Sequence, residues 1–177
     1  MKKVILLQIL IAISLKMVGQ NHNPVFIGIQ PAITVEPFYE KGVFDINIFP
    51  AVVEIPIGNR VDFRFLPLIN YHVGDMKNGI SDLGFYSVFP VYFKEREKKT
   101  ARPHGLYLGP VFGIGRNLIN EHYTTTIALE PGYLFEAKNK FTISIGLQLG
   151  GSHFMYNTQP NEWVFHWGPK ISLGFWL

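Results

Sequence analysis

Apolar and polar residues alternate one by one through most of the chain after residue 20, which is the period of a β-strand with two unlike faces. No long segment in this part keeps the period of a helix. Stretches rich in turn-forming residues separate the alternating runs, and the fourth run is apolar on both faces. Eight strands are expected, at about residues 24–36, 43–55, 60–72, 83–94, 105–117, 123–136, 140–152 and 163–177.

The two faces of these strands differ in size as well as in polarity. One face is bulky and almost uncharged, whereas the other consists mostly of Gly, Ser, Thr, Ala and Gln with isolated charges. A soluble protein usually covers its outer face with Lys and Glu. The small polar face suits the narrow lumen of a closed barrel instead. The sequence therefore predicts an all-β fold, an eight-stranded antiparallel up-and-down transmembrane β-barrel. Its outward belt is expected to include Phe63, Phe65, Ile145, Leu147, Ile171 and Leu173.

The connections between the runs differ in length in an alternating way. Tight turns are expected near Gly58 and at residues 137–139. Longer connections are expected at 36–42, 73–82 and 153–162. Short periplasmic turns and longer external loops are the usual asymmetry of outer-membrane barrels. The segment 95–104 is the exception, since it belongs to the short-turn side yet is long and highly charged.

Several polar residues of the small face fall near mid-height of the strands. Buried charges need partners, because an isolated buried charge costs several kcal/mol or more. We therefore expect a charge network rather than an open channel, in which Glu130 pairs with Lys170, with Arg64 or with both. The expected lumen network consists of Gln30, Arg64, Glu130, Gln148 and Lys170.

A proline recurs at a matching place in seven of the eight runs. The local pattern is apolar-x-apolar-x-Pro-x-apolar, as in 127–133 and 63–69. Since proline donates no ladder hydrogen bond, such a repeat predicts a ring of bulges or widened steps. All of these prolines are expected on the outer face, near one level of the barrel. They are Pro31, Pro50, Pro67, Pro90, Pro110, Pro131 and Pro169.

The first twenty residues have the pattern of an export signal. Lys2 and Lys3 precede the apolar run 4–15, and small and polar residues follow, with cleavage expected after Gly19 or Gln20. The expected organisation is a signal peptide over 1–20 and a β-barrel domain over 21–177. The signal holds three of the sixteen Lys and Arg residues and no acid, which leaves thirteen basic and thirteen acidic residues in the rest. This balance gives no support to nucleic-acid binding.

The chain ends on a strand-like run, Lys170-Ile171-Ser172-Leu173-Gly174-Phe175-Trp176-Leu177. This run resembles the terminal-strand signal of outer-membrane barrels, with Gly174, Phe175 and Leu177 as the signal residues. The whole of 21–177 is similar in pattern to the small OmpA/OmpX-like barrels. The resemblance implies a monomer in the cell outer membrane of a Gram-negative bacterium. It also implies that outer-membrane lipid and the barrel-assembly machinery are partners.

Residues that could carry chemistry are few. There is no cysteine, and the six histidines show no metal-ligand spacing, so no metal and no cofactor are expected. No catalytic residue is expected, and a structural or surface-interaction role through the external loops is the favoured function. One alternative is a lipid A hydrolase, because Ser152, His153 and Glu162 lie near the outer end of the last hairpin. Adjacent strand residues point to opposite faces, however, which makes Ser152 and His153 a poor nucleophile–base pair. A barrel that binds a lipid or small ligand is the other alternative.

Overall fold

The computed structural model describes residues 24–34, 42–74, 78–96, 102–136, 140–157 and 159–177. The signal peptide expected over 1–20 lies outside these residues. Within them, no helix is long and apolar enough to cross a membrane.

The described residues form one antiparallel sheet of eleven strand segments. In chain order these are β1 (Phe26–Ile29), β2 (Ile33–Thr34), β3 (Phe44–Asn47), β4 (Ala51–Pro56), β5 (Asp62–Val73), β6 (Gly79–Val88), β7 (Val91–Tyr92), β8 (Gly105–Asn117), β9 (His122–Glu136), β10 (Phe141–Tyr156) and β11 (Glu162–Trp176).

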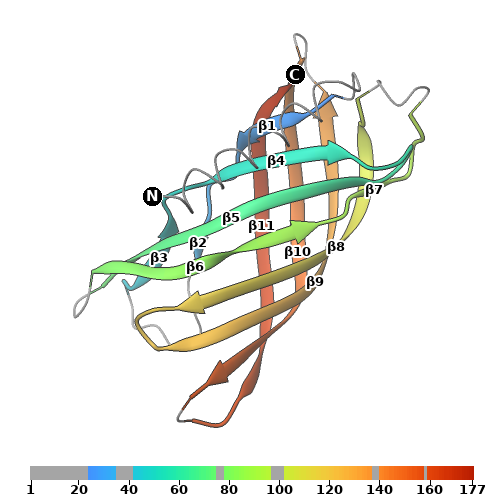
Figure 1. Cartoon of the computed structure of the whole chain (residues 1–177). Helices are drawn as coiled ribbons and strands as arrows, with labels where there is room; N and C mark the ends of the chain where they lie inside the picture. The colour runs from blue at the N-terminus through green and yellow to red at the C-terminus, as the bar shows by residue number, and fades with distance from the viewer. Residues whose placement is uncertain (1–23, 35–41, 75–77, 97–101, 137–139, 158) are drawn as a thin grey trace, which may run out of the picture.

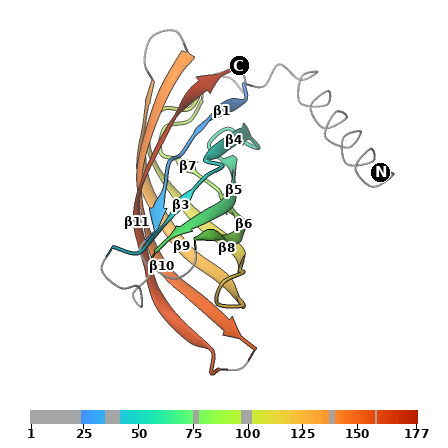
Figure 2. The ribbon, with the colours of Figure 1, turned by 90° about the vertical axis from the view of Figure 1, so that its left-hand side faces the viewer.

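The eleven segments make eight barrel strands, because β1 with β2, β3 with β4, and β6 with β7 are each one strand with an interruption. The sheet closes on itself through the pairing of β5 with β6 and of β1 with β11 (Figure 1, Figure 2). A path that passes from strand to strand through paired residues returns to β1 about ten residues from where it started. This shear means that the strands are strongly tilted relative to the barrel axis. The eight-stranded antiparallel up-and-down architecture is therefore confirmed.

The alternation of the sequence separates the outward and inward sides of the wall. Outward Ile145, Leu147 and Ile171 are exposed. Of the other expected belt residues, Phe63 and Phe65 are half-buried because the rings of Phe89 and Phe85 pack against them, and Leu173 is also half-buried. Most inward neighbours of these residues are buried and polar, and Lys170 is half-buried.

The C-terminus lies at one end of the barrel (Figure 1). Apolar inward residues gather near that end. There Phe26 packs against Trp176, with 5.5 Å between their ring centroids. The buried apolar cluster consists of Phe26, Val52, Leu66, Val88, Tyr92, Tyr107, Val111, Ala128, Leu134 and Trp176. This cluster explains the fourth run: its inward residues Val88 and Tyr92 belong to the core, so the strand is apolar on both faces.

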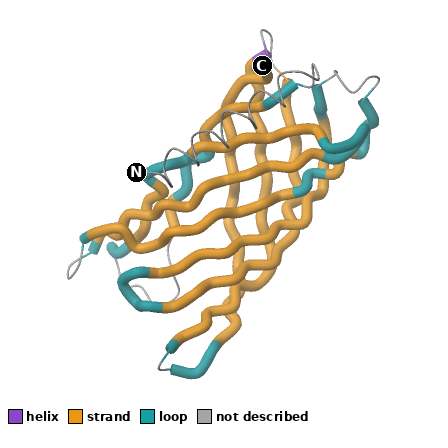
Figure 3. Tube along the Cα trace, viewed as in Figure 1, coloured by secondary structure: helices purple, strands orange, loops and turns teal. Residues whose placement is uncertain are grey.

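The connections differ from the expected lengths at the end opposite the C-terminus. β5 continues to Val73 and β6 already begins at Gly79, while β10 continues to Tyr156 and β11 begins at Glu162. Two expected long loops are therefore short. Residues 79–82 pair with β5, and the segment after residue 152 pairs on both sides, with β9 and with β11. The resulting β10–β11 hairpin projects past the other strands (Figure 3).

The expected common ring of outward prolines is wrong. Pro90 is buried, lying between Val88 and Tyr92 on the inward register, and Pro50 is half-buried at the break between β3 and β4. Asn47 and Val53 are six residues apart in the chain, whereas their partners on β5, Asn70 and Phe65, are five residues apart. The break therefore contains one extra residue, as in a β-bulge. The prolines thus act at separate places, and no shared mechanism follows from their repeat.

Glycines on the inward face make room for the large rings of the lumen. A Cβ added at Gly113 would overlap the ring of Tyr86, which is a side-chain conflict and not a backbone one. At Gly168 the nearest atoms to an added Cβ are 3.7 and 3.9 Å away, both from the Lys170 side chain. The two positions differ in how much space they have.

We expect Gly113→Ala to lower the free energy of unfolding by about 1–3 kcal/mol, because the new methyl group overpacks the lumen against Tyr86. Gly168→Ala is the matched control and should change it by less than about 0.5 kcal/mol. Urea unfolding of the refolded protein measures both. The loss should largely disappear in a Tyr86→Ala background; an equal loss there would show that the ring is not the cause.

Candidate functional site

The centre of the lumen holds a fully buried guanidinium group. Arg64 lies on the inward face of β5 and is 1% exposed. Its Nε donates to Glu54 Oε2 at 2.6 Å, and its Nη1 donates to Glu130 Oε1 at 2.8 Å. Glu54 comes from the adjacent β4, whereas Glu130 comes from β9 across the lumen. One side chain therefore ties opposite walls of the barrel together.

Each carboxylate beside Arg64 has further donors. The Tyr107 hydroxyl donates to Glu130 Oε1 at 2.8 Å, and Gln148 Nε2 donates to Glu130 Oε2 at 2.6 Å. The Tyr92 hydroxyl donates to Glu54 Oε1 at 2.7 Å. Such charge-assisted bonds offset part of the cost of burying ions. The network fills the lumen at this level.

Inward glycines decide which side chains can enter the network. Gly132 and Gly146 face each other across β9 and β10. A Cβ at Gly132 would overlap the Tyr107 ring, and one at Gly146 would lie 3.0 Å from Glu130 Cγ. The glycine-rich face noted in the sequence thus provides the space that Tyr107 and Glu130 occupy.

A second buried ion pair closes the lumen at the end near the C-terminus. Arg96 follows β7 and forms a buried salt bridge with Asp62 at the start of β5. Its Nη1 also donates to the Gly58 carbonyl at 2.7 Å, and its guanidinium lies over the Tyr92 ring. The long charged segment that was the exception in the sequence thus sends a side chain into the barrel.

Sequence reasoning missed this pair. Arg96 and its neighbours have no alternation that would assign an inward position, and Asp62 was only one polar residue among several on its face. The signal that could have found them is the length of the 93–104 connection on the side of the barrel where short turns are usual.

The structure brings together three of the five expected network residues, Arg64, Glu130 and Gln148, and Glu130 pairs with Arg64 as expected. Gln30 lies apart from them and accepts a hydrogen bond from Ser172 at 2.7 Å. Lys170 is half-buried on the inward face of β11 and makes no ion pair with any described residue. The alternative pairing of Glu130 with Lys170 is therefore not formed.

Of the residues of the expected assembly signal, Gly174 and Phe175 lie in β11 and Leu177 directly follows it. Gly174 faces Gly28 of β1, and a side chain at either position would overlap the opposite backbone. Phe175 and Leu177 are exposed on the outer side. Gly174 thus has a packing role in the closure of the barrel.

The three residues of the hydrolase alternative do not meet. Ser152 is buried in the lumen and shares a 2.8 Å hydrogen bond with Thr126. His153 lies on the outer side, where its ring stacks on Trp163 at 4.9 Å. Glu162 accepts a hydrogen bond from the Tyr156 hydroxyl at 2.9 Å.

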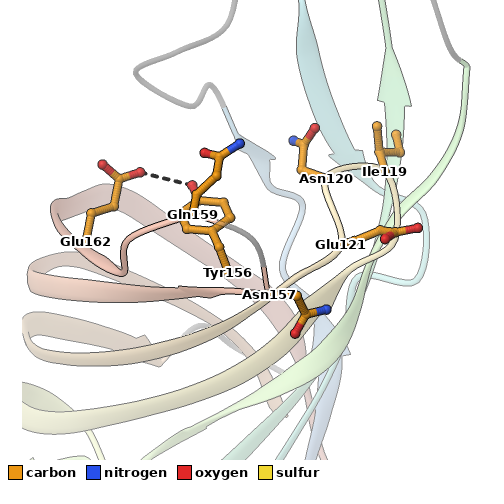
Figure 4. Close-up of a pocket in the computed structure, with 7 residues that line it drawn as sticks. All are labelled: Ile119, Asn120, Glu121, Tyr156, Asn157, Gln159 and Glu162. Carbon is orange, nitrogen blue, oxygen red and sulfur yellow. Dashed lines mark hydrogen bonds between the residues drawn. The ribbon is translucent and has the colours of Figure 1, made fainter.

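The lumen mouth at the projecting hairpin is polar. Asp45 contacts the ring of His72 at 2.7 Å, and Asp82 accepts hydrogen bonds from Asn70 and Asn117 at 3.2 and 2.9 Å. A pocket lies beyond it, between the β8–β9 turn and the hairpin tip (Figure 4). Its lining residues are Ile119, Asn120, Glu121, Tyr156, Asn157, Gln159 and Glu162. In the described part of the chain, no three His, Asp or Glu side chains are placed to hold a metal ion.

Comparison with known proteins gives no relative: no family model, no curated protein and no solved structure matches this chain.

The Arg64 network predicts a large difference between two arginines. Arg64→Met should lower the free energy of unfolding by about 3–5 kcal/mol, because it leaves Glu54 and Glu130 buried without a cation. Arg102→Met, which removes the exposed partner of Glu136, is the matched control and should cost less than about 1 kcal/mol.

Equilibrium unfolding in urea, with the protein refolded into lipid vesicles, measures the two variants side by side. Equal effects would show that the buried network contributes no more than a surface ion pair.

Proposed function

We propose that this chain is an integral β-barrel protein of the Gram-negative outer membrane. In this proposal it has no catalytic activity and a structural or surface-interaction role through its external loops. The observation that carries the proposal is the apolar outer face. Each of the eight barrel strands presents an exposed large apolar side chain outward, in order Ile29, Val53, Tyr71, Phe85, Ile114, Leu129, Leu147 and Ile171.

The inward face supports the same proposal. A soluble carrier barrel keeps its apolar residues inside and its charges outside. Here Glu54, Arg64, Glu130 and Gln148 are buried in the lumen, and the outer wall is apolar on all sides. In hydrocarbon every backbone group must find a partner, which a closed antiparallel barrel provides. A bilayer is the environment in which this arrangement is stable.

The ends of the barrel suggest an orientation. The end near the C-terminus has the tight turn after β4 and the buried ion pair of Arg96 with Asp62. We assign this end to the periplasm. The projecting β10–β11 hairpin and the polar pocket would then face outward. Since the Arg64 network fills the lumen, the proposal assigns no conducting channel to the barrel centre.

The hydrolase alternative receives no support from the contacts of its residues. Ser152 and His153 point to opposite faces of β10, and each is engaged with another side chain.

Heat-modifiable gel migration of a membrane-fraction sample tests the proposal. A membrane barrel resists unfolding in cold detergent and changes mobility after boiling, so folded and boiled samples should run as different bands. A soluble-fraction protein with a single band under both conditions would contradict the proposal.

The lipid-facing assignment makes a sharper prediction. Leu147→Arg should lower the free energy of unfolding in vesicles by about 2–4 kcal/mol, because it places a charge near the middle of the hydrocarbon. Gln159→Arg at the exposed hairpin tip is the control and should change it by less than about 0.5 kcal/mol. Unfolding by urea in phosphatidylcholine vesicles measures both, and a Leu147→Arg variant as stable as the control would count against lipid contact.

A further inference from the structure

The outer wall of the barrel carries a single charged side chain. Among the described residues of the eleven strand segments, Arg116 on β8 is the only Asp, Glu, Lys or Arg on the outward register, and it is exposed. Glu136 and Glu162 are also exposed, but they lie at strand ends on the inward register, opposite Thr142 and Phe154. A lone cation on an otherwise uncharged wall requires a physical reason.

Arg116 lies at the end of the apolar wall and not at its middle. The outward residues of β8 run from Leu106, beside the end with the C-terminus, to Arg116, ten residues later. At about 3.3 Å per residue and a tilt of about 40°, the two residues are about 25 Å apart along the barrel axis. That distance equals the height of the apolar band of outer-membrane barrels, about 25 Å. Arg116 therefore lies at the level of lipid headgroups, at the end of the barrel that we assign to the outside.

An aromatic ring positions the guanidinium group of Arg116. Tyr123 of β9 lies opposite Arg116 in the sheet, and the guanidinium carbon is 5.5 Å from the centre of its ring. This cation–π contact leaves the N–H donors of the guanidinium available for an acceptor. No described Asp or Glu forms an ion pair with Arg116. The protein thus holds the cation in place but does not supply its counter-charge.

The wall around Arg116 is polar at the rim and apolar below it. Thr125 of β9 pairs with Ile114 of β8 and with His153 of β10, so a hydroxyl group and an imidazole lie on the neighbouring strands. Ile114 is the next outward residue of β8 toward the middle of the barrel, and it is exposed. A cation with polar neighbours above an apolar wall fits an amphiphile whose charged group is an anion.

We propose that Arg116 and Tyr123 form a binding site for the phosphate group of an anionic lipid in the outer leaflet, with an acyl chain along Ile114. This rests on the proposed membrane location and orientation. Charge complementarity carries the proposal, because a guanidinium group binds a phosphate through two parallel N–H donors. Extension of Arg116 into water, with no preference among lipids, is the competing explanation of its position.

Tryptophan quenching by brominated lipid distinguishes the two explanations. The chain has three tryptophans, and Trp163→Phe/Trp167→Phe leaves only Trp176, which is 1% exposed inside the lumen. Adding Ile114→Trp places a reporter beside Arg116. The protein is placed in phosphatidylcholine vesicles in which a minor fraction of the lipid, either phosphatidylglycerol or phosphatidylcholine, has brominated chains. The anionic lipid should associate with the Ile114→Trp reporter about fivefold more strongly.

Two controls separate a local site from a general attraction. Arg116→Gln in the reporter background should abolish the preference. Arg102→Gln is the matched charge control, because Arg102 pairs with Glu136 at the opposite end of the barrel, and it should retain the preference. The position control is Trp163→Phe alone, in which Trp167 reports on lipid at β11, three strands from β8. There the two brominated lipids should quench equally.

The outcomes separate this proposal from the membrane proposal. Equal quenching of the Ile114→Trp reporter by the two lipids, or an unchanged preference in Arg116→Gln, would overturn the lipid site. An equal preference at Trp167 would show a general attraction and would overturn it too. The heat-induced mobility shift on the same samples would in those cases leave the membrane barrel standing. A missing shift would remove the membrane proposal itself.

Discussion

The width of the lumen is the constraint on which the rest of the structure depends. Eight strands enclose a space that packed side chains fill, so most inward residues are small, apolar or hydrogen-bonded. Arg64 occupies the centre of that space and binds Glu54 and Glu130 from opposite walls. Gly132 and Gly146 are glycines because Tyr107 and Glu130 need their room. The polar residues lie mostly inside and the large apolar residues lie on the outer wall, an arrangement that is compatible with a membrane barrel.

The sequence alone was sufficient for the architecture and for part of the lumen. Period-two alternation defines strand faces directly, and residues that share the inward face at similar depth can meet, as Arg64 and Glu130 do. It was not sufficient where alternation is absent. Arg96 enters the lumen from an irregular charged segment, and only the closed barrel shows that Asp62 is within its reach. The extent of β10 was also underestimated, because residues after Ser152 are polar and aromatic but pair on both sides.

The prolines show how a true sequence pattern can suggest a wrong mechanism. Their spacing is regular, yet the position of each in its strand decides its effect. Pro90 faces the core, and Pro50 accompanies a bulge. Pro31 and Pro169 remove donors on the two sides of one join. The pairing of the first and last strands joins residues far apart in the sequence, and no local pattern reveals it.

The central claim is that the outward residues of the barrel wall contact lipid while the inward residues are packed in the lumen. A single-cysteine spin-label scan along β10 measures this directly. Labels at 145–150 would be compared for collision with oxygen, which concentrates in lipid, and with a water-soluble nickel chelate. The account predicts oxygen contact at Ile145, Leu147 and Leu149, with little of either probe at Gly146 and Gln148. High chelate access at the odd positions, or no alternation, would contradict it.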